Sequence, residues 1–141
     1  MDQIIEFARD NLILSGIWIA LVAMLAYSFI SPLLSNVKRV DNHGATLLIN
    51  KSDAVLLDIR PLKDFKAGHI VGARHVKPEE VREANFTKLE KFKNTPIVVV
   101  CAMGNLAAGT ASKMSKQGFT NVNVLSGGMG AWQSAGLPVE K

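Results

Sequence analysis

The absence of charged residues between Asn11 and Val37 restricts the fold of this chain more than any other feature of its sequence. Residues 12–30 within this stretch are apolar apart from two serines, one glycine and one tyrosine. A bilayer core is about 30 Å thick and takes roughly 20 helical residues to cross. The stretch is apolar on every side, which argues against a helix lying on a surface. We therefore predict a transmembrane helix over residues 12–31, in contact with the lipid bilayer.

A cleaved signal peptide and a buried core helix are the alternatives for this segment. A signal peptide has a basic N-terminal region, a shorter apolar region and a small-residue cleavage site. Here Asp2, Glu6 and Asp10 outnumber Arg9 before the apolar run, and no A-x-A site follows it. A core helix is usually shorter and needs no apolar residues on its outer side. Both comparisons favour a membrane anchor.

The cations that flank the apolar segment predict its orientation. Lys38 and Arg39 follow the segment, whereas only Arg9 precedes it. The positive-inside rule then places the C-terminal part in the cytoplasm and the N-terminus outside. This arrangement is a single-pass protein of the inner (plasma) membrane. The single cysteine fits a reducing compartment and excludes both an intramolecular disulfide and a CxxC redox pair.

The charge pattern divides the chain into segments and excludes some partners. We predict a short N-terminal tail (1–11), the transmembrane helix (12–31), a linker (32–38) and a soluble domain (39–141). The net charge of +4 forms no basic stripe with interleaved aromatic residues, so nucleic acid is not an expected partner. The three histidines lack the spacing of zinc ligands, so no metal is expected.

Three short apolar runs in the soluble part predict buried strands. They are Ala54–Ile59, Pro96–Cys101 and Val122–Leu125, with weaker candidates at Val37–Val40 and Arg74–Val76. Continuous β-branched runs without polar alternation indicate strands that are covered on both faces.

Helix signals alternate with these strands. Asp41 or Asn42 is placed to cap one helix, and Pro78 suits the first turn of another. A third pattern runs from Leu106 to Gln117 and ends at Gly118. The alternation predicts an α/β domain: a small, mostly parallel sheet flanked by helices on both faces, preceded by one transmembrane helix.

Cys101 ends the valine-rich strand and precedes the third predicted helix. Parallel sheets bind ligands at the carboxyl ends of their strands. A loop that leads into a helix N-terminus directs backbone N–H groups at one point and favours the thiolate form of a cysteine. Cys101 is therefore either a nucleophile in an anion-binding cradle or a small buried hydrophobe. Its position alone leaves both interpretations open.

Two groups of short motifs resemble the two signatures of the rhodanese domain. The first group comprises Asp58–Arg60 and Phe65–Ala73. The second comprises Cys101 with Gly104, Gly118–Phe119, Gly127–Trp132 and Gly136–Val139. The groups occur in the right order, and the resemblance covers roughly residues 38–140, outside the predicted anchor.

The resemblance implies a single rhodanese domain that transfers sulfur. Cys101 would attack a sulfur donor, carry the sulfur as a persulfide and pass it to a thiol acceptor. The loop that would bind the persulfide consists of Ala102, Met103, Gly104, Asn105 and Leu106. Asp58 and Arg60 would form a supporting pair, and no metal or organic cofactor would be needed. The identities of donor and acceptor remain open.

The loop departs from the pattern of active family members. These often carry Arg two residues after the loop glycine, followed by Ser or Thr, whereas this chain has Leu106 and Ala107. Without that cation we expect poor use of thiosulfate, while a less charged donor or a protein-bound persulfide remains open. Cysteine-dependent phosphatases need His before the cysteine and Arg six residues after it. Val100 and Ala107 occupy those places and argue against phosphatase chemistry.

The sequence thus supports two functions. The first is a membrane-anchored sulfurtransferase, or sulfane-sulfur carrier, that uses Cys101. The second is a catalytically weak binding module of the same fold, which recruits a partner, such as another membrane protein, to the bilayer. Outside the cysteine loop, we interpret His69 as a packed residue, and Gly127, Gly128 and Gly130 as a tight strand-to-helix turn.

Overall fold

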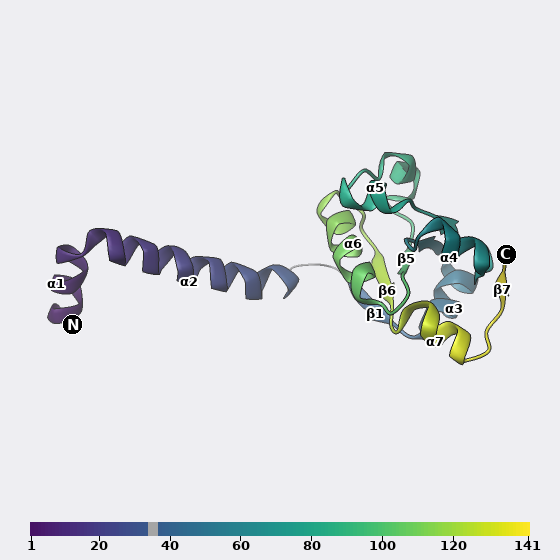
Figure 1. The fold of residues 1–141 in the computed structure, drawn as a ribbon, viewed down its shortest axis with the longest axis horizontal. Helices are drawn as coiled ribbons and strands as arrows, with labels where there is room; N and C mark the ends of the chain where they lie inside the picture. Colours follow the sequence, from purple (N-terminus) through teal and green to yellow (C-terminus); the bar gives the residue numbers. More distant parts are fainter. Residues whose placement is uncertain (34–36) are drawn as a thin grey trace. The chain divides into compact units, whose positions relative to one another are not determined.

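The computed structural model describes residues 1–33 and 37–141 and divides the chain into two compact units, Met1–Leu34 and Ser35–Lys141 (Figure 1). Two helices, α1 (Asp2–Asp10) and α2 (Leu12–Leu33), make up the first unit. Residues 34–36 of the predicted linker lie outside the described residues.

Helix α2 is long and apolar enough to cross a membrane. Its segment Leu12–Ile30 has a mean hydropathy of 2.2, and none of that segment is buried in the protein. The helix continues through Pro32 to Leu33, slightly beyond the end that we predicted at residue 31. A proline removes one backbone hydrogen bond but does not have to end a helix within its last turn. With about 1.5 Å of rise per residue, its 22 residues exceed the thickness of a bilayer core by a few ångströms.

Helix α1 was not predicted, because the sequence analysis treated residues 1–11 as a tail. Its backbone is helical from Asp2 to Asp10, and it has no buried residue. The chain leaves the helical conformation at Asn11, with φ −127° and ψ 55°, and bends there before α2 begins. The N–H of Asn11 still donates a hydrogen bond to the carbonyl of Phe7 at 3.1 Å.

The second unit is an α/β domain. Its strands are β1 (Lys38–Val40), β2 (Val55–Asp58), β3 (His69–Ile70), β4 (Arg74–His75), β5 (Ile97–Val100), β6 (Val122–Leu125) and β7 (Val139–Glu140). Its helices are α3 (Asn42–Ser52), α4 (Leu62–Ala67), α5 (Pro78–Arg82), the 3₁₀ helix η1 (Thr87–Phe92), α6 (Asn105–Lys116) and α7 (Gly128–Ser134). Five strands form a parallel sheet in the order β1-β6-β5-β2-β4, and β3 pairs with β7 in a separate antiparallel ribbon. The predicted fold class is confirmed.

The apolar run of β5 explains why the sheet needs helices on both faces. Ile97 and Val99 belong to one core cluster, which includes Met114 of α6. Val98 and Val100 belong to the other cluster, which includes Trp132 of α7. Successive side chains of a strand point to opposite faces, so an unbroken apolar strand must be covered twice. This arrangement puts β5 at the centre of the sheet.

Three local signals fix the ends of helices as predicted. The Asp41 carboxylate caps α3 by accepting the N–H of Gly44 at 2.7 Å, and Pro78 opens α5. Gly118, with φ +99°, follows the end of α6. Asp41 supplies an acceptor for a free N–H of the first turn, whereas Pro78 and Gly118 supply backbone conformations that suit the start and the end of a helix.

The first turn of α5 is held by a small polar network. Glu80 accepts the backbone N–H of Lys77 at 3.3 Å and the ammonium group of Lys88 at 2.8 Å. The hydrogen bond from Lys88 favours the ionised carboxylate and holds the pKa of Glu80 below its usual value. This network connects α5 to η1, and α5 forms one wall of the groove described below.

Candidate functional site

Cys101 directly follows β5, the central strand of the sheet. The residue is 3% exposed, and its Sγ accepts the backbone N–H of Gly104 at 2.9 Å. Gly104 has φ +93°, a left-handed conformation that side chains rarely adopt, and α6 begins at the next residue. The loop therefore turns back on the sulfur and directs a backbone donor at it. Such a donor stabilises negative charge on sulfur.

The glycine-rich start of α7 holds this loop by main-chain contacts. The N–H of Met129 donates to the carbonyl of Cys101 at 2.9 Å, and the N–H of Gly130 donates to the carbonyl of Ala102 at 3.1 Å. A Cβ atom at Gly128 would lie 2.2 Å from the Cys101 oxygen. The two backbones thus approach more closely than any side chain at position 128 would allow.

The sequence predicts only a tight turn for the glycines at positions 127, 128 and 130. Gly127 and Gly128 do adopt positive φ values of +74° and +56° between β6 and α7. Gly128 also packs against the cysteine loop. That contact is with residues about 25 positions away in the sequence, so the residues next to Gly128 do not predict it. The only pointer in the sequence is the pair of adjacent glycines, because one glycine suffices for most turns.

Gly128→Ala should disrupt the cysteine loop. The new methyl group would overlap the Cys101 carbonyl and take a left-handed conformation, so we expect the free energy of unfolding to fall by about 2–4 kcal/mol. Urea denaturation of fragment 37–141 measures this loss. Gly130→Ala places its Cβ no closer than 3.5 Å to the loop, and Gly136→Ala tests positive φ in open space. If all three variants lose equal stability, close approach at position 128 is not the cause.

The outer surface of the loop is apolar or neutral. Met103 and Leu106 are 69% and 76% exposed, and Ala102 and Asn105 are also exposed. The segment 102–106 carries no charged side chain. The predicted loop residues therefore follow a buried sulfur, and the hydrogen bond that this sulfur accepts comes from the main chain, at the N–H of Gly104.

A groove of about 330 Å³ lies beside this loop, between α5 and α6. Pro78, Val81 and Arg82 line it from α5, and Leu106 and Lys113 are among the residues that line it from α6. Leu106 belongs to both the loop and the groove, whereas Cys101 does not line the groove. Arg82 and Lys113 carry no signal in the sequence as site residues, because only the fold brings these two helices together.

Asp58 and Arg60 form a buried ion pair. The Nη2 atom of Arg60 lies 2.8 Å from Asp58 Oδ2, and Nε lies 3.0 Å from Oδ1. The two residues are 1% and 9% exposed. Nη2 also donates to the carbonyl of Gly68 at 2.8 Å, which joins the end of β2 to the start of β3. Ile59, which lies between the two residues of this ion pair, is hydrogen-bonded to β5: its N–H donates to the Val100 carbonyl at 3.0 Å.

His69 packs inside the domain. Its ring stacks on Phe65 with centroids 3.8 Å apart, and its Nδ1 lies 2.8 Å from the Phe65 carbonyl. Its Nε2 lies 3.4 Å from a carboxylate oxygen of Glu140, so both ring nitrogens have neighbours. These contacts give His69 a packing role at the β3–β7 ribbon. Within residues 1–33 and 37–141, no three His, Cys, Asp or Glu residues are grouped as metal ligands.

The fold and the cysteine loop define a rhodanese-like protein, and the sequence matches the Rhodanese-like domain family over residues 43–135. The chain belongs to this family. It is similar to YibN of Escherichia coli K12, with 38% identity over 139 residues, which cover 99% of this chain and 97% of that one. It is also similar to the thiosulfate sulfurtransferase GlpE of Pseudomonas putida, with 37% identity over 101 residues, or 72% and 89% of the two chains.

A solved structure agrees with this membership. The solution structure of a rhodanese-like domain from Anabaena superimposes with a TM-score of 0.63 at 27% identity, and the match covers 72% of this chain and 77% of that one. The resemblance seen in the sequence motifs is therefore confirmed. The similarity to YibN extends over nearly the whole chain, whereas the match to GlpE covers only 72% of it.

Proposed function

We propose that this protein is a membrane-anchored sulfurtransferase that carries sulfane sulfur on Cys101. The Cys101 thiolate attacks the outer sulfur of a donor, a new S–S bond forms, and the donor leaves with the electron pair of the bond that breaks. With thiosulfate the leaving group is sulfite. A thiolate acceptor then attacks the outer sulfur of the persulfide and regenerates the Cys101 thiolate.

The hydrogen bond from Gly104 to the cysteine sulfur is the observation that carries this proposal. It directs a fixed N–H donor at Sγ at 2.9 Å, in a position 3% exposed to solvent. A donor of this kind stabilises the thiolate of the resting enzyme and the anionic persulfide more strongly in a dry site than in water. The GlpE relatives support the reaction class, because they are named thiosulfate sulfurtransferases.

Mass spectrometry of the protein after incubation with thiosulfate, or with a low-molecular-weight persulfide, tests the proposal. We expect an added mass of one sulfur atom, about 32 Da, on the peptide that contains Cys101, and its removal by cyanide. The persulfide should load the protein more efficiently than thiosulfate does, because residues 102–106 offer no cation to a doubly charged donor. If neither donor leaves sulfur on Cys101, the sulfurtransferase proposal fails.

Leu106→Arg should improve the use of thiosulfate. Leu106 is 76% exposed and stands where active relatives often carry arginine, so the new side chain has room. A bidentate hydrogen bond between arginine and an oxyanion is worth roughly 1.5–3 kcal/mol. We therefore expect kcat/KM for thiosulfate to rise roughly 10- to 100-fold, at about 1.4 kcal/mol per tenfold change. A cyanide-coupled assay measures the change.

Leu106→Lys is the matched control for this variant. Lysine supplies the charge without the planar fork, so its gain should be smaller. Loading from a neutral persulfide donor should change little in either variant. Equal thiosulfate rates in the wild type and both variants would show that the missing cation does not limit the reaction.

The binding-module alternative keeps one specific observation in its favour. The loop has no cationic side chain, and two of its exposed residues, Met103 and Leu106, are large and apolar. In that function Cys101 is a packed residue and the domain recruits a partner to the membrane. A thiol that alkylates no faster than free cysteine, and that accepts no sulfur, would favour this alternative.

We further propose that α2 anchors the protein in the inner membrane with its N-terminus outside and its catalytic domain in the cytoplasm. The composition of Leu12–Ile30 supports insertion, and Lys38 and Arg39 after the helix support this orientation. Protease treatment of intact spheroplasts should remove an N-terminal epitope and spare a C-terminal one. The opposite pattern would reverse the orientation.

A further inference from the structure

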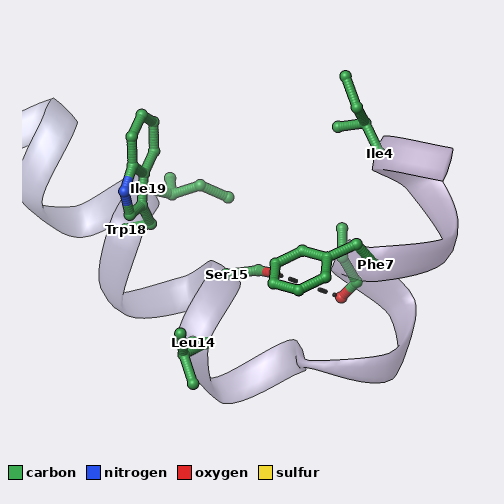
Figure 2. A pocket seen from close by; sticks show the side chains of 7 residues that line it. Ile4, Phe7, Leu14, Ser15, Trp18 and Ile19 are labelled. Carbon is green, nitrogen blue, oxygen red and sulfur yellow. Dashed lines mark hydrogen bonds between the residues drawn. The ribbon is translucent and has the colours of Figure 1, made fainter. Parts of the chain in front are cut away.

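An open cavity of about 320 Å³ lies between α1 and α2 at their bend (Figure 2). Ile4 and Phe7 line it from α1, and Ser15, Trp18 and Ile19 are among the residues that line it from α2. Its volume lies within the range of small-ligand pockets, roughly 300–1,000 Å³. The side chains of Ile4 and Phe7 are 74% and 59% exposed, so the protein leaves them accessible to a ligand.

The cavity offers almost no polar group to a ligand. Of the described lining residues, Ser15 and Trp18 have polar side-chain groups, and the Ser15 hydroxyl donates to the Ala8 carbonyl at 3.4 Å (Figure 2). Among the residues that the structure describes, no charged one lines the cavity. A peptide, a sugar or a phosphate would lose its hydrogen bonds to water there without gaining new ones. A hydrocarbon chain loses nothing of that kind.

Helix α1 is amphipathic, and its apolar side faces this cavity. At 100° per residue, Ile4, Phe7 and Ala8 fall on one arc of the helix, and all three line the cavity. The charged residues Asp2, Glu6 and Arg9 lie on the side opposite that arc, and Asp10 lies beside them. The apolar face of α1 therefore points to the inner side of the bend, towards α2.

A helix that turns sharply away from a membrane-spanning helix, with its apolar face on the inner side of the bend, fits the surface of a bilayer (Figure 1). If α2 crosses the membrane, the inner side of this bend is filled by the outer part of the hydrocarbon layer. Trp18 lies six residues into α2, about 9 Å from its start at 1.5 Å per residue. The cavity thus spans the depth where acyl chains begin.

We propose that α1 lies in the membrane interface and that the acyl chain of a phospholipid from the same leaflet occupies the cavity. This inference rests on the proposed anchoring by α2. A second copy of the chain is a less suitable occupant, because residues 12–30 contain no GxxxG pattern for close helix packing.

Tryptophan fluorescence of the full-length protein in phospholipid vesicles tests the proposal. The chain has two tryptophans, Trp18 in α2 and Trp132 in the core of the soluble domain. Phe7→Trp in a Trp18→Phe background reports on the apolar face of α1, and Glu6→Trp in the same background is the matched control on its polar face. Trp18→Phe alone supplies the signal of Trp132 for subtraction.

Lipids with bromine atoms at shallow positions of the acyl chain should quench the tryptophan at position 7 roughly twofold more than the one at position 6. The reason is that an interfacial helix buries its apolar face roughly 5–10 Å into the headgroup–acyl boundary. Aqueous iodide should show the reverse order. Equal quenching of both positions by iodide would place α1 in water and overturn the proposal.

Two further outcomes separate this inference from the anchoring on which it rests. In the wild-type protein, brominated lipids should quench Trp18. If they do so while position 7 is quenched only by iodide, α2 is inserted and the lipid site alone fails. If Trp18 is not quenched either, the anchoring fails. A tryptophan at position 7 that neither bromine nor iodide reaches would mean that protein, such as a second copy, fills the cavity, which also overturns the proposal.

Discussion

Cys101→Ser should abolish sulfur transfer while leaving the fold intact. Serine is close to cysteine in volume, and its hydroxyl can still accept the N–H of Gly104, so the loop keeps its conformation. A hydroxyl is a far weaker nucleophile than a thiol at neutral pH and forms no persulfide. We expect kcat/KM for any sulfane donor to fall by about 10³-fold or more, measured by a coupled assay for transferred sulfur.

Met103→Leu is the matched control for the loss of Cys101. Met103 is the other sulfur-containing residue of the loop and is 69% exposed, but a thioether has no proton to lose and cannot become a thiolate. Its replacement should leave the persulfide on Cys101 unchanged. Urea denaturation should show that Cys101→Ser unfolds within about 1 kcal/mol of the wild type. Sulfur transfer by the serine variant at the wild-type rate would remove Cys101 from the mechanism.

Features that depend on neighbours in the sequence could be predicted. The unbroken apolar residues of Ile97–Val100 required cover on both faces of the sheet, and the two core clusters provide it. Asp41 and Pro78 stand at the starts of helices. The Asp41 carboxylate accepts a free N–H group of the first turn, and Pro78 has no N–H that would need an acceptor there. In each case the physical cause lies within a few residues of its effect.

Features that depend on distant contacts could not be predicted. The β3–β7 ribbon pairs Ile70 with Val139, and each strand has only two residues, too few to give an alternating pattern. The contact between Gly128 and the Cys101 carbonyl is equally nonlocal, although it shapes the candidate site. The candidate residue Cys101 is thus visible in the sequence, whereas the main-chain contacts that position its loop are not.

The 3₁₀ helix η1 contains a side chain whose environment differs from the one that the sequence suggests. In the sequence, Lys88, Lys91 and Lys93 lie around Phe92, a pattern that is typical of the solvated face of a helix. In the structure, Lys91 and Arg74 both lie 5.0 Å from the centre of the Phe92 ring. Cations at this distance are attracted to the ring face, and their aliphatic stems can shield it from water. A solvated charge cluster therefore also covers a half-buried aromatic residue.

Arg60→Met should cost more stability than any surface change in this domain. The substitution keeps a long side chain but leaves the Asp58 carboxylate, which is 1% exposed, without its cation. Removing one partner of a buried ion pair typically costs about 3–5 kcal/mol. The loss includes the hydrogen bond to Gly68 that ties β2 to β3. Because small domains have only about 5–15 kcal/mol of stability, we expect partial unfolding at 37 °C, measured by urea denaturation of fragment 37–141.

The double variant Asp58→Asn with Arg60→Met separates the buried charge from the lost contacts. An asparagine at position 58 is neutral, and its side-chain oxygen can still accept the backbone N–H of residue 60, which lies 3.0 Å away in the wild type. Because the double variant buries no unpaired charge, it should be more stable than Arg60→Met alone, by about 1–3 kcal/mol. If the double variant is instead the less stable one, the uncompensated carboxylate is not the cause, and the Arg60 contacts with Gly68 carry the effect. In either case the loss of stability should reach the cysteine loop, because the N–H of Ile59 donates to the carbonyl of Val100, the residue before Cys101.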